Sequence, residues 1–427
     1  MMAVAMDKLQ GQLPRSGKDG FILVTGGLGY IGSHTALELM KEGYHVVIVD
    51  NLSNSFASTR WRIQHLAAQH CEAQGRPTPQ LHFHRLDYKN TAMMRLVLEQ
   101  YCSWPCGNHF AKGAMRPELL FNPPPREAAE PGPSSWVRSQ ISGVIHFAAS
   151  KSVEESIHDP LGYYDNNVCG LVGFIRLLAE FNIRNFIFSS SATVYGSKAN
   201  GERALREDDV IHQPGYCSET GAVVEPNVEG LTCSYARTKY FCEAILADVA
   251  RADPHWRIVA LRYFNPVGCD PSGLLGETPR TKPTNLFPVV GEVLSGGRPA
   301  LCVFGRDWPT RDGTAIRDYV HVADIARGHV AALCEYNRTR EPFRTYNLGS
   351  GTGTSVLEIV SSLEAVAQRP VPIEWRGRRA GDVGCCIAST TRAEVELGWT
   401  PRESIAQSAR DLWNHTQTTH KIRMPEN

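Results

Sequence analysis

The sequence predicts an α/β protein with a doubly wound parallel sheet and a smaller α/β domain after it. Two observations lead to this prediction. Along residues 21–263, short apolar runs alternate with helical patterns, an order typical of strands covered by helices on both faces. A glycine-rich turn joins the first apolar run to the first helix, which makes the opening unit strand, turn, helix, strand.

The opening unit sets the pattern for the elements that follow. Phe21 to Thr25 is a short run rich in β-branched residues, and a helical pattern extends from Ile31 to about Glu42, with Gly43 as its stop. Tyr44 to Asp50 has a continuously apolar core, which fits a strand buried on both faces. Further strands are predicted at Leu81 to Arg85, Gly143 to Ala149, Phe186 to Ser189 and Arg257 to Tyr263.

The domain organisation follows from where this alternation breaks. We expect a flexible tail over 1–20, a first domain over 21–263 and a second over 264–427, with some segments of the second returning to the first. Two stretches interrupt the first domain, at about 111–136, which is proline-rich, and at 212–232, which is polar and glycine-containing. Both are predicted to be inserted loops.

Composition and charge exclude several classes of protein. The 427 residues hold 44 basic and 44 acidic side chains, so no nucleic-acid partner is expected. No apolar run reaches the ~18 residues of a membrane span. Twelve cysteines without a repeating frame indicate free thiols in a reducing, cytoplasmic compartment. Cys102, Cys106 and His109 lie close together, but they lack a fourth ligand at metal spacing, so no metal is expected.

The glycine-rich turn is a candidate dinucleotide site. Gly26, Gly29 and Gly32 follow a strand and open a helix, where glycines permit a tight turn and close approach of a pyrophosphate to the backbone. Asp50 ends the next strand, near the ~20-residue offset of the carboxylate that binds the adenosine ribose. That carboxylate would repel a 2′-phosphate, so the sequence favours NAD over NADP. The turn thus predicts a Rossmann-type nucleotide domain.

A second group of residues indicates the reaction. Tyr235 and Lys239 are four residues apart, so a helix places both on one face, and Ser191 lies at the end of a predicted strand. A tyrosine can act as the base of a hydride-transfer reaction if neighbouring cations lower its pKa from ~10. We predict that Lys239 and the nicotinamide supply those charges, and that Ser191 hydrogen-bonds the same substrate oxygen.

At these residues the chain resembles the extended short-chain dehydrogenase/reductase family, most closely its branch of UDP-glucose 4-epimerases. The matching stretches are Thr25 to His34, Asp50 to Ser55, Phe186 to Gly196, Leu261 to Gly268 and Arg317 to Val322, within a resemblance from about Phe21 to Trp413. One departure is that the intervening residues of the Tyr235 motif read Ala236, Arg237 and Thr238 instead of the usual Gly-Lys-Ser.

The resemblance also implies which residues hold the ligands. For NAD, besides Gly26, Gly29, Gly32, Tyr235 and Lys239, they are Tyr30, Ile31, Asp50, Asn51, Asn54, Ser55, Asp87, Tyr88, Phe147, Ala148, Ala149, Lys151, Asn166 and Phe264. For a UDP-sugar, besides Ser191, they are Asn265, Asn285, Phe304, Arg317, Arg379, Asp382 and Cys386. The family also implies a homodimer.

The reaction that the resemblance implies is reversible inversion at C4 of UDP-glucose and UDP-galactose, through a 4-keto sugar, within galactose metabolism. Cys386 is small at the position that borders the C2 substituent, so we expect UDP-N-acetylglucosamine and UDP-N-acetylgalactosamine to be accepted too. Two alternatives were weighed. A 4,6-dehydratase needs an acid and a base where this chain has Ala192 and Thr193, and a non-catalytic NAD-binding regulator would not need Tyr235, Lys239 and Ser191.

Overall fold

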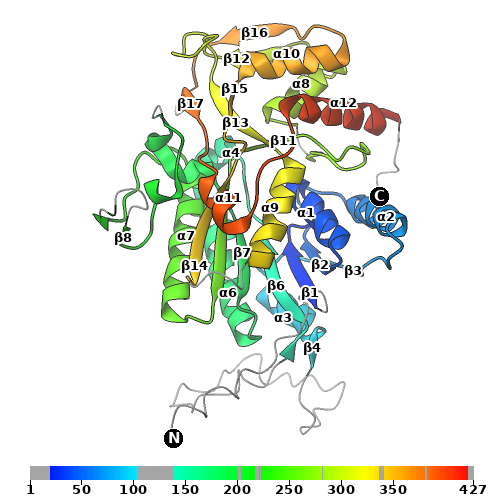
Figure 1. Cartoon of the computed structure of the whole chain (residues 1–427), viewed down its shortest axis with the longest axis vertical. Helices are drawn as coiled ribbons and strands as arrows, with labels where there is room; N and C mark the ends of the chain where they lie inside the picture. Colours follow the sequence, from blue (N-terminus) through cyan, green and yellow to red (C-terminus); the bar gives the residue numbers. More distant parts are fainter. Residues whose placement is uncertain are drawn as a thin grey trace, which may run out of the picture.

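The computed structural model describes residues 20–103, 138–200, 203–216, 221, 223–280, 282–335, 341–379 and 382–421. Figure 1 shows a large lobe around a central sheet and a smaller lobe above it, formed by later parts of the chain. Residues 1–19 of the predicted tail, the whole insert at 111–136, and Cys106 and His109 lie outside the described residues.

The large lobe is built on seven parallel strands in the order β14-β10-β7-β6-β1-β2-β3. Chain order reverses between β1 and β6, and such a switch point opens a crevice at the carboxyl ends of the strands. The strands are β1 (Phe21–Thr25), β2 (His45–Asp50), β3 (Leu81–Arg85), β6 (Ile141–His146), β7 (Asn185–Ser191), β10 (Arg257–Tyr263) and β14 (Phe343–Leu348).

Helices cover both faces of this sheet because side chains alternate along each strand. Val46 and Ile48 of β2 belong to one apolar core, while Val47 and Val49 belong to the other. The first core contains side chains of α1 (Tyr30–Lys41), α2 (Ser58–Ala73), α9 (Val322–Glu335) and α11 (Thr391–Leu397). The second contains side chains of α3 (Thr91–Glu99), α6 (Gly170–Glu180) and α7 (Ser234–Ala252).

The smaller lobe has its own apolar core, between three helices and short strands. The helices are α8 (Leu286–Leu294), α10 (Val356–Ala367) and α12 (Ile405–Lys421). In one sheet, β13 (Ile316–His321) pairs with β11 (Asn265–Val267), β15 (Gly353–Ser355) and β17 (Cys385–Cys386). In another, β12 (Leu301–Phe304) pairs with β16 (Ile373–Arg376). Figure 1 shows this lobe beyond the carboxyl ends of the large sheet.

The predicted fold class is confirmed, with local differences in the elements. Three predicted strands match β1, β3 and β10, whereas the strand predicted to reach Ala149 ends at His146 as β6. Strand β14 was not among the predicted strands, and it extends the large sheet from the second half of the chain. Within the described residues, no helix is both long and apolar enough to span a membrane.

The two predicted inserts both contain or adjoin short antiparallel pairs. Strands β4 (Cys102–Ser103) and β5 (Arg138–Ser139) pair on either side of the first insert. The segment 212–232 holds a hairpin of β8 (Gly215–Tyr216) and β9 (Val223–Val224), so it is not purely a loop. The remaining short elements are α4 (Val153–His158), α5 (Pro160–Tyr163), a π-helix η2 (Tyr164–Cys169) and the 3-10 segments η3 (Ala192–Asn200) and η4 (Glu207–Asp209).

Candidate active site

The turn between β1 and α1 has space only for glycine at two positions. A Cβ on Gly32 would stand 2.4 Å from the Gly26 carbonyl oxygen, and one on Gly26 would stand 2.8 Å from the Ala148 nitrogen. Gly26 also has a φ of +69°, which favours glycine. Gly29 is the N-cap of α1, and no side chain caps this end of the helix. Its backbone N–H groups can therefore bind an anion such as a pyrophosphate.

Asp50 ties this turn to the loop after β2. One carboxylate oxygen accepts the Leu28 N–H at 3.0 Å, and the other accepts the Leu52 N–H at 2.9 Å and the Ser55 hydroxyl at 2.8 Å. A carboxylate has about four acceptor sites, so one remains for a ribose hydroxyl. Asp50 therefore shapes the cradle, and it can bind a ligand there as well.

The other residues predicted to contact the adenosine half surround the same crevice. Asn51 donates to Asp87 at 3.2 Å, which joins the loops after β2 and β3. Asn54 accepts the backbone N–H of Arg280 at 3.0 Å, so a segment of the smaller lobe lies against this loop. The hydroxyl of Tyr30 donates to the Gly268 carbonyl at 2.6 Å, so it links the two lobes. Ligand contacts from these side chains stay predictions.

The predicted residues of the cofactor path gather at the ends of β6 and η2. Phe147, Ala148 and Ala149 directly follow β6 and are half-buried. Tyr88 donates its hydroxyl to the Asn166 carbonyl. Lys151 contacts Glu277 at 3.0 Å, and Asn285 donates to the same Glu277 oxygen at 2.8 Å. Glu277, which sequence reasoning did not single out, therefore brings together a predicted cofactor residue and a predicted substrate residue.

Tyr235, Lys239 and Ser191 lie together where α7 passes the end of β7. The Lys239 ammonium donates to the Ser189 carbonyl at 2.6 Å and stands 6.0 Å from the centre of the Tyr235 ring. Ser191 Oγ accepts the N–H and the hydroxyl of Thr193, at 3.2 and 3.1 Å. Its own proton is therefore available to donate, and its hydrogen bond lowers the pKa of Tyr235.

The electrostatics of this pair differ from the prediction. Burial raises the pKa of Tyr235 to about 12, and the hydrogen bond from Ser191 only partly opposes that rise. Burial likewise lowers the pKa of Lys239 to about 8. The ammonium is directed at the Ser189 carbonyl, and the Tyr235 ring is farther away. Lys239 therefore does not by itself produce a phenolate, and the protein groups alone leave Tyr235 protonated at neutral pH.

The predicted substrate residues lie mainly in the smaller lobe. The Arg379 guanidinium lies over the Phe304 ring, 4.5 Å from its centre, and donates to Asp382 at 3.0 Å. Arg317 is 3.9 Å from the other Asp382 oxygen, so two guanidinium groups flank one carboxylate. Such forked donors suit a pyrophosphate.

Of two further predicted residues, Asn265 contacts β13 within the smaller lobe, and Cys386 connects this group to the large lobe. Asn265 donates to the Asp318 carbonyl at 2.9 Å. Cys386 pairs with Arg317 in the β13–β17 ladder and shares a small apolar core with Phe264. The fold thus brings a predicted nicotinamide neighbour, Phe264, and a predicted sugar neighbour, Cys386, into one cluster.

Asn167 is a site residue that sequence reasoning missed. It lies in the π-helix η2, a distortion often found at functional sites. Its side chain accepts the Ser150 N–H at 2.9 Å and donates to Thr238 of α7 at 3.0 Å. It therefore joins the loop after β6 to the helix that carries Tyr235. The adjacent pair Asn166 and Asn167 is the local signal for this site, and the family resemblance implies a ligand contact only for Asn166.

Metal binding finds no support in the described part of the chain, where no three His, Cys, Asp or Glu side chains form a group that could hold an ion. A buried histidine nevertheless lies near the site. His146 ends β6 and is 2.7 Å from the Thr25 hydroxyl. Burial, followed by the charge of Lys239, lowers the pKa of His146 to about 3, so this imidazole is neutral.

Comparisons with known proteins indicate the family of this chain. The model of the NAD dependent epimerase/dehydratase family matches residues 135–349, and that of GDP-mannose 4,6 dehydratase matches residues 23–103. The UDP-glucose 4-epimerase 2 of Arabidopsis thaliana is 38% identical over 92% of this chain and 94% of its own length. The UDP-glucose 4-epimerase of Drosophila melanogaster is 37% identical over 92% of this chain and 95% of its own length.

Among solved structures, a UDP-glucose 4-epimerase from Bifidobacterium longum, in complex with NAD+ and UDP, superposes with a TM-score of 0.74. It is 36% identical, and the match covers 94% of this chain and 99% of that one. The relatives therefore match both lobes, including the segments that carry Tyr235 and Arg317.

Proposed function

This chain belongs to the UDP-glucose 4-epimerases of the NAD-dependent epimerase/dehydratase family, and we propose that Tyr235, Lys239 and Ser191 carry out its C4 epimerisation. The observation that carries this proposal is their convergence at the end of β7, on the crevice that opens between β1 and β6. The substrate is UDP-glucose or UDP-galactose, and the intermediate is a 4-keto sugar.

NAD fits the residues that line the crevice. Gly26 and Gly32 permit the tight turn, since a Cβ at either position would collide with neighbouring backbone, and Asp50 retains an acceptor site for a ribose hydroxyl. We propose that these residues, together with the others assigned to NAD from the sequence, hold the cofactor. Bound NAD supplies the hydride acceptor and donor for the reaction.

The chain's own groups then have separate tasks. The phenolate of Tyr235, favoured by the positive nicotinamide of bound NAD, takes the proton of the 4′-hydroxyl. Ser191, whose hydroxyl already bonds that tyrosine, orients the same substrate oxygen. Lys239 holds the end of β7 through Ser189. Arg317 and Arg379 bind the pyrophosphate. Held by its UDP group, the keto sugar can turn its other face to the reaction centre before the hydride returns.

One assay separates this proposal from its alternatives. The purified protein is incubated with UDP-galactose, and the products are resolved by chromatography. Formation of UDP-glucose supports the epimerase, whereas a 4-keto-6-deoxy product would indicate a dehydratase. Bound NAD recovered from denatured protein with no product at all would favour the non-catalytic regulator.

We further propose a division of labour between the two parts of the chain. Residues 21–263 bind NAD and residues 264–427 bind the UDP-sugar, with β14 and α9 returning to the large lobe. The small Cys386 side chain supports acceptance of N-acetylated sugars. The free thiols of the described cysteines support a cytoplasmic location, which cell fractionation can test.

A homodimer is also proposed, through one face of the large lobe. Exposed apolar side chains gather on neighbouring elements there: Val153 and Ile157 on α4, Leu161 on α5 and Phe241 on α7. Leu161 is 78% exposed and Ile157 60% exposed, which is costly for large apolar side chains in water. A second copy of this chain, presenting the same face about a two-fold axis, would cover them.

A further inference from the structure

Arg262 and Glu243 form an ion pair with no exposed side-chain surface beside the proposed active site. Arg262 Nε and Nη2 donate to the two Glu243 oxygens at 3.1 and 2.7 Å. The other donors of Arg262 reach the Tyr195 hydroxyl at 3.2 Å and the carbonyls of Glu207 and Val210 at 3.0 and 2.8 Å. All five N–H groups of this guanidinium are therefore used.

Glu243 has two more partners, and both belong to the surroundings of the site. The Ser190 hydroxyl donates to one of its oxygens, and His212 Nε2 lies 2.7 Å from the other. Since a carboxylate only accepts, His212 carries its proton on Nε2. Glu243 therefore joins α7 to the end of β7 and to the first residue of the segment 212–232.

The spacing along α7 connects Glu243 to the chemistry. Tyr235, Lys239 and Glu243 follow at intervals of four, so they lie along one side of the helix. Along β7, Ser190 points away from the side that Ser189 and Ser191 face. Lys239 donates to the Ser189 carbonyl, and Glu243 accepts the Ser190 hydroxyl, so α7 is bonded to the end of β7 at two consecutive residues. These two hydrogen bonds set the position of Tyr235 relative to Ser191.

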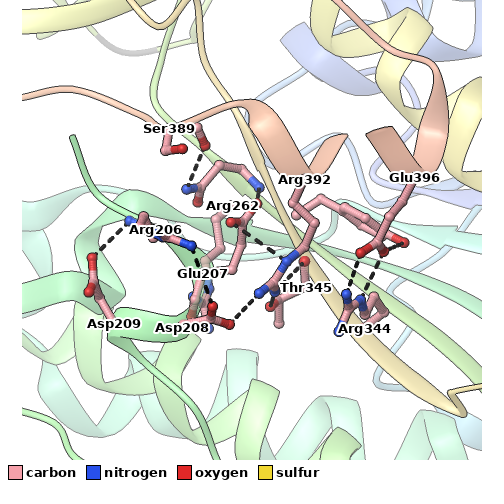
Figure 2. A network of polar contacts seen from close by, with 12 residues as sticks. Arg206, Glu207, Asp208, Asp209, Arg262, Arg344, Thr345, Ser389, Arg392 and Glu396 are labelled. Atoms are coloured by element: carbon pink, nitrogen blue, oxygen red, sulfur yellow. Dashed lines mark hydrogen bonds and ion pairs between the residues drawn. The ribbon is translucent and has the colours of Figure 1, made fainter. Parts of the chain in front are cut away.

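A second set of polar contacts keeps the ion pair from shifting. Figure 2 shows Arg262 behind the segment of Glu207 and Asp208, which is bound in turn by Arg392 of α11. The Glu207 side chain also accepts the Asn347 N–H of β14 at 2.8 Å. The segment whose carbonyls accept hydrogen bonds from Arg262 is thus bonded to elements from the second half of the chain.

The charges of the buried groups also favour the pairing of Glu243 with Arg262. Burial by itself would raise the pKa of Glu243, but Arg262 and His212 hold it well below its usual range. The carboxylate is therefore ionised at neutral pH, and its hydrogen bonds are of the short, directional, charge-assisted kind. Apolar side chains could fill the same volume, but they would not define the direction of each contact.

We propose that Glu243, oriented by Arg262, is a positioning residue of the epimerisation, and that Ser190 and His212 are the contacts through which it acts. The inference rests on the proposed roles of Tyr235, Lys239 and Ser191. Glu243 itself is enclosed by its partners and has no path to the substrate. Its effect is to keep Tyr235, the general base, at a fixed position relative to Ser191.

The test removes a contact and keeps the ion pair, because Glu243→Gln would leave the Arg262 charge buried without its partner and can prevent folding. In Ser190→Ala we expect kcat to fall about tenfold, with KM and NAD content within twofold of wild type. The kinetic isotope effect with UDP-galactose deuterated at C4 should rise, because hydride transfer becomes more limiting. The matched control is Ser408→Ala, another buried serine whose hydroxyl bonds a backbone carbonyl, that of Ser404.

A second contact tests the same mechanism independently. His212→Ala should also lower kcat, and His212→Gln should restore most of it, because the glutamine amide can donate to Glu243. If both contacts act through Glu243, the loss in the Ser190→Ala/His212→Ala double variant will be smaller than the product of the single losses.

Other outcomes would overturn the inference. These are a kcat within twofold of wild type in Ser190→Ala, an equal loss in Ser408→Ala, or multiplicative losses in the double variant. Tyr235→Phe is measured beside them. Activity retained in Tyr235→Phe would reject the proposed base itself. An inactive Tyr235→Phe with a normal Ser190→Ala would reject only the role of Glu243.

Discussion

At the residue scale, the burial of Tyr235 and Lys239 disfavours the charged form of each side chain. Burial raises the pKa of Tyr235 to about 12 and lowers that of Lys239 to about 8. A base with so high a pKa is inefficient near pH 7. The hydrogen bond from Ser191 acts in the required direction, because it lowers the pKa of Tyr235.

The first prediction concerns the phenolic oxygen. Tyr235→Phe should lower kcat by about 10²–10⁴-fold, the usual contribution of a general base. UDP binding, measured by calorimetry, should stay within twofold, because Arg317 and Arg379 are untouched. Tyr101→Phe serves as the matched control, because it removes a hydroxyl that lies 2.8 Å from His82 Nδ1. Near-normal turnover in Tyr235→Phe would assign the base to another residue.

The second prediction concerns the breadth of the sugar pocket. Wild type should interconvert UDP-N-acetylglucosamine and UDP-N-acetylgalactosamine, and Cys386→Tyr should lower kcat/KM for this pair by about 10–100-fold relative to the unsubstituted sugars. The reason is that tyrosine is much larger than cysteine and would take up volume next to Phe264, at the position where the resemblance places the C2 substituent. Cys385→Ser, at the neighbouring position, should leave the ratio unchanged. An unchanged ratio in Cys386→Tyr would mean that another residue determines whether the N-acetyl group is accepted.

At the scale of elements, the first insert is held at its base by a short ladder. Cys102 pairs with Ser139 and Ser103 with Arg138, so the two ends of the intervening segment leave from neighbouring positions. Loop closure between such ends costs little free energy, and the cost rises slowly with length. The ladder explains how an insertion here leaves β6 in register with β1.

The third prediction follows from this ladder. Removing residues 111–133 and rejoining the chain with a short glycine-serine linker should change the melting temperature by no more than a few degrees. Activity toward UDP-galactose should stay within twofold, because the contacts that the described residues make with Tyr235, Lys239 and Ser191 come from other segments. Scanning calorimetry and the epimerase assay measure both effects. Loss of soluble protein would show that the removed segment packs on the rest of the chain.

At the scale of the whole molecule, buried neutral histidines set the response to acid. Burial lowers the pKa of His146 to about 3 and those of His34 and His329 to about 4. In the unfolded chain each titrates near 6.5. The unfolded state therefore binds more protons between about pH 6.5 and 4, and stability is lost as the pH falls through that window.

The fourth prediction states the size of that loss. Each histidine contributes about 1.4 kcal/mol per pH unit to the slope, so the three together contribute about 4 kcal/mol per unit below pH 6. Urea unfolding with excess NAD at several pH values measures it. His34→Asn should reduce the slope by about one third and retain a donor for the Tyr30 carbonyl. His255→Asn is the control, since His255 is 89% exposed; an equal change in both variants would contradict the prediction.

The fifth prediction concerns assembly. Ile157→Glu combined with Leu161→Glu should convert a dimer into a monomer, because two carboxylates would be buried against their own copies across the two-fold axis. Analytical ultracentrifugation measures the mass. Val395→Glu is the matched control, because Val395 is equally exposed but lies on α11. A monomeric wild type, or a dimer that survives the double substitution, would reject this interface.

The sequence by itself determined the strands β1, β2, β3 and β10, the glycine turn and the spacing of Tyr235 and Lys239. Each of these depends on neighbours within about ten residues, where periodicity and steric space act directly. The dinucleotide crevice follows from them, because in a parallel sheet the turn after β1 and the ends of β2 and β6 open on one edge.

Only the tertiary structure decided which distant side chains meet. Glu243 and His212 lie in no matched stretch, and the stretch that contains Arg262 does not reveal its partner. Glu277 likewise joins Lys151 to Asn285. The same holds for β14, whose residues pair with β10 residues that lie 85 positions earlier in the chain. Burial makes these partners obligatory, since a buried charge or strand edge needs a partner, and the identity of that partner depends on how the whole chain packs.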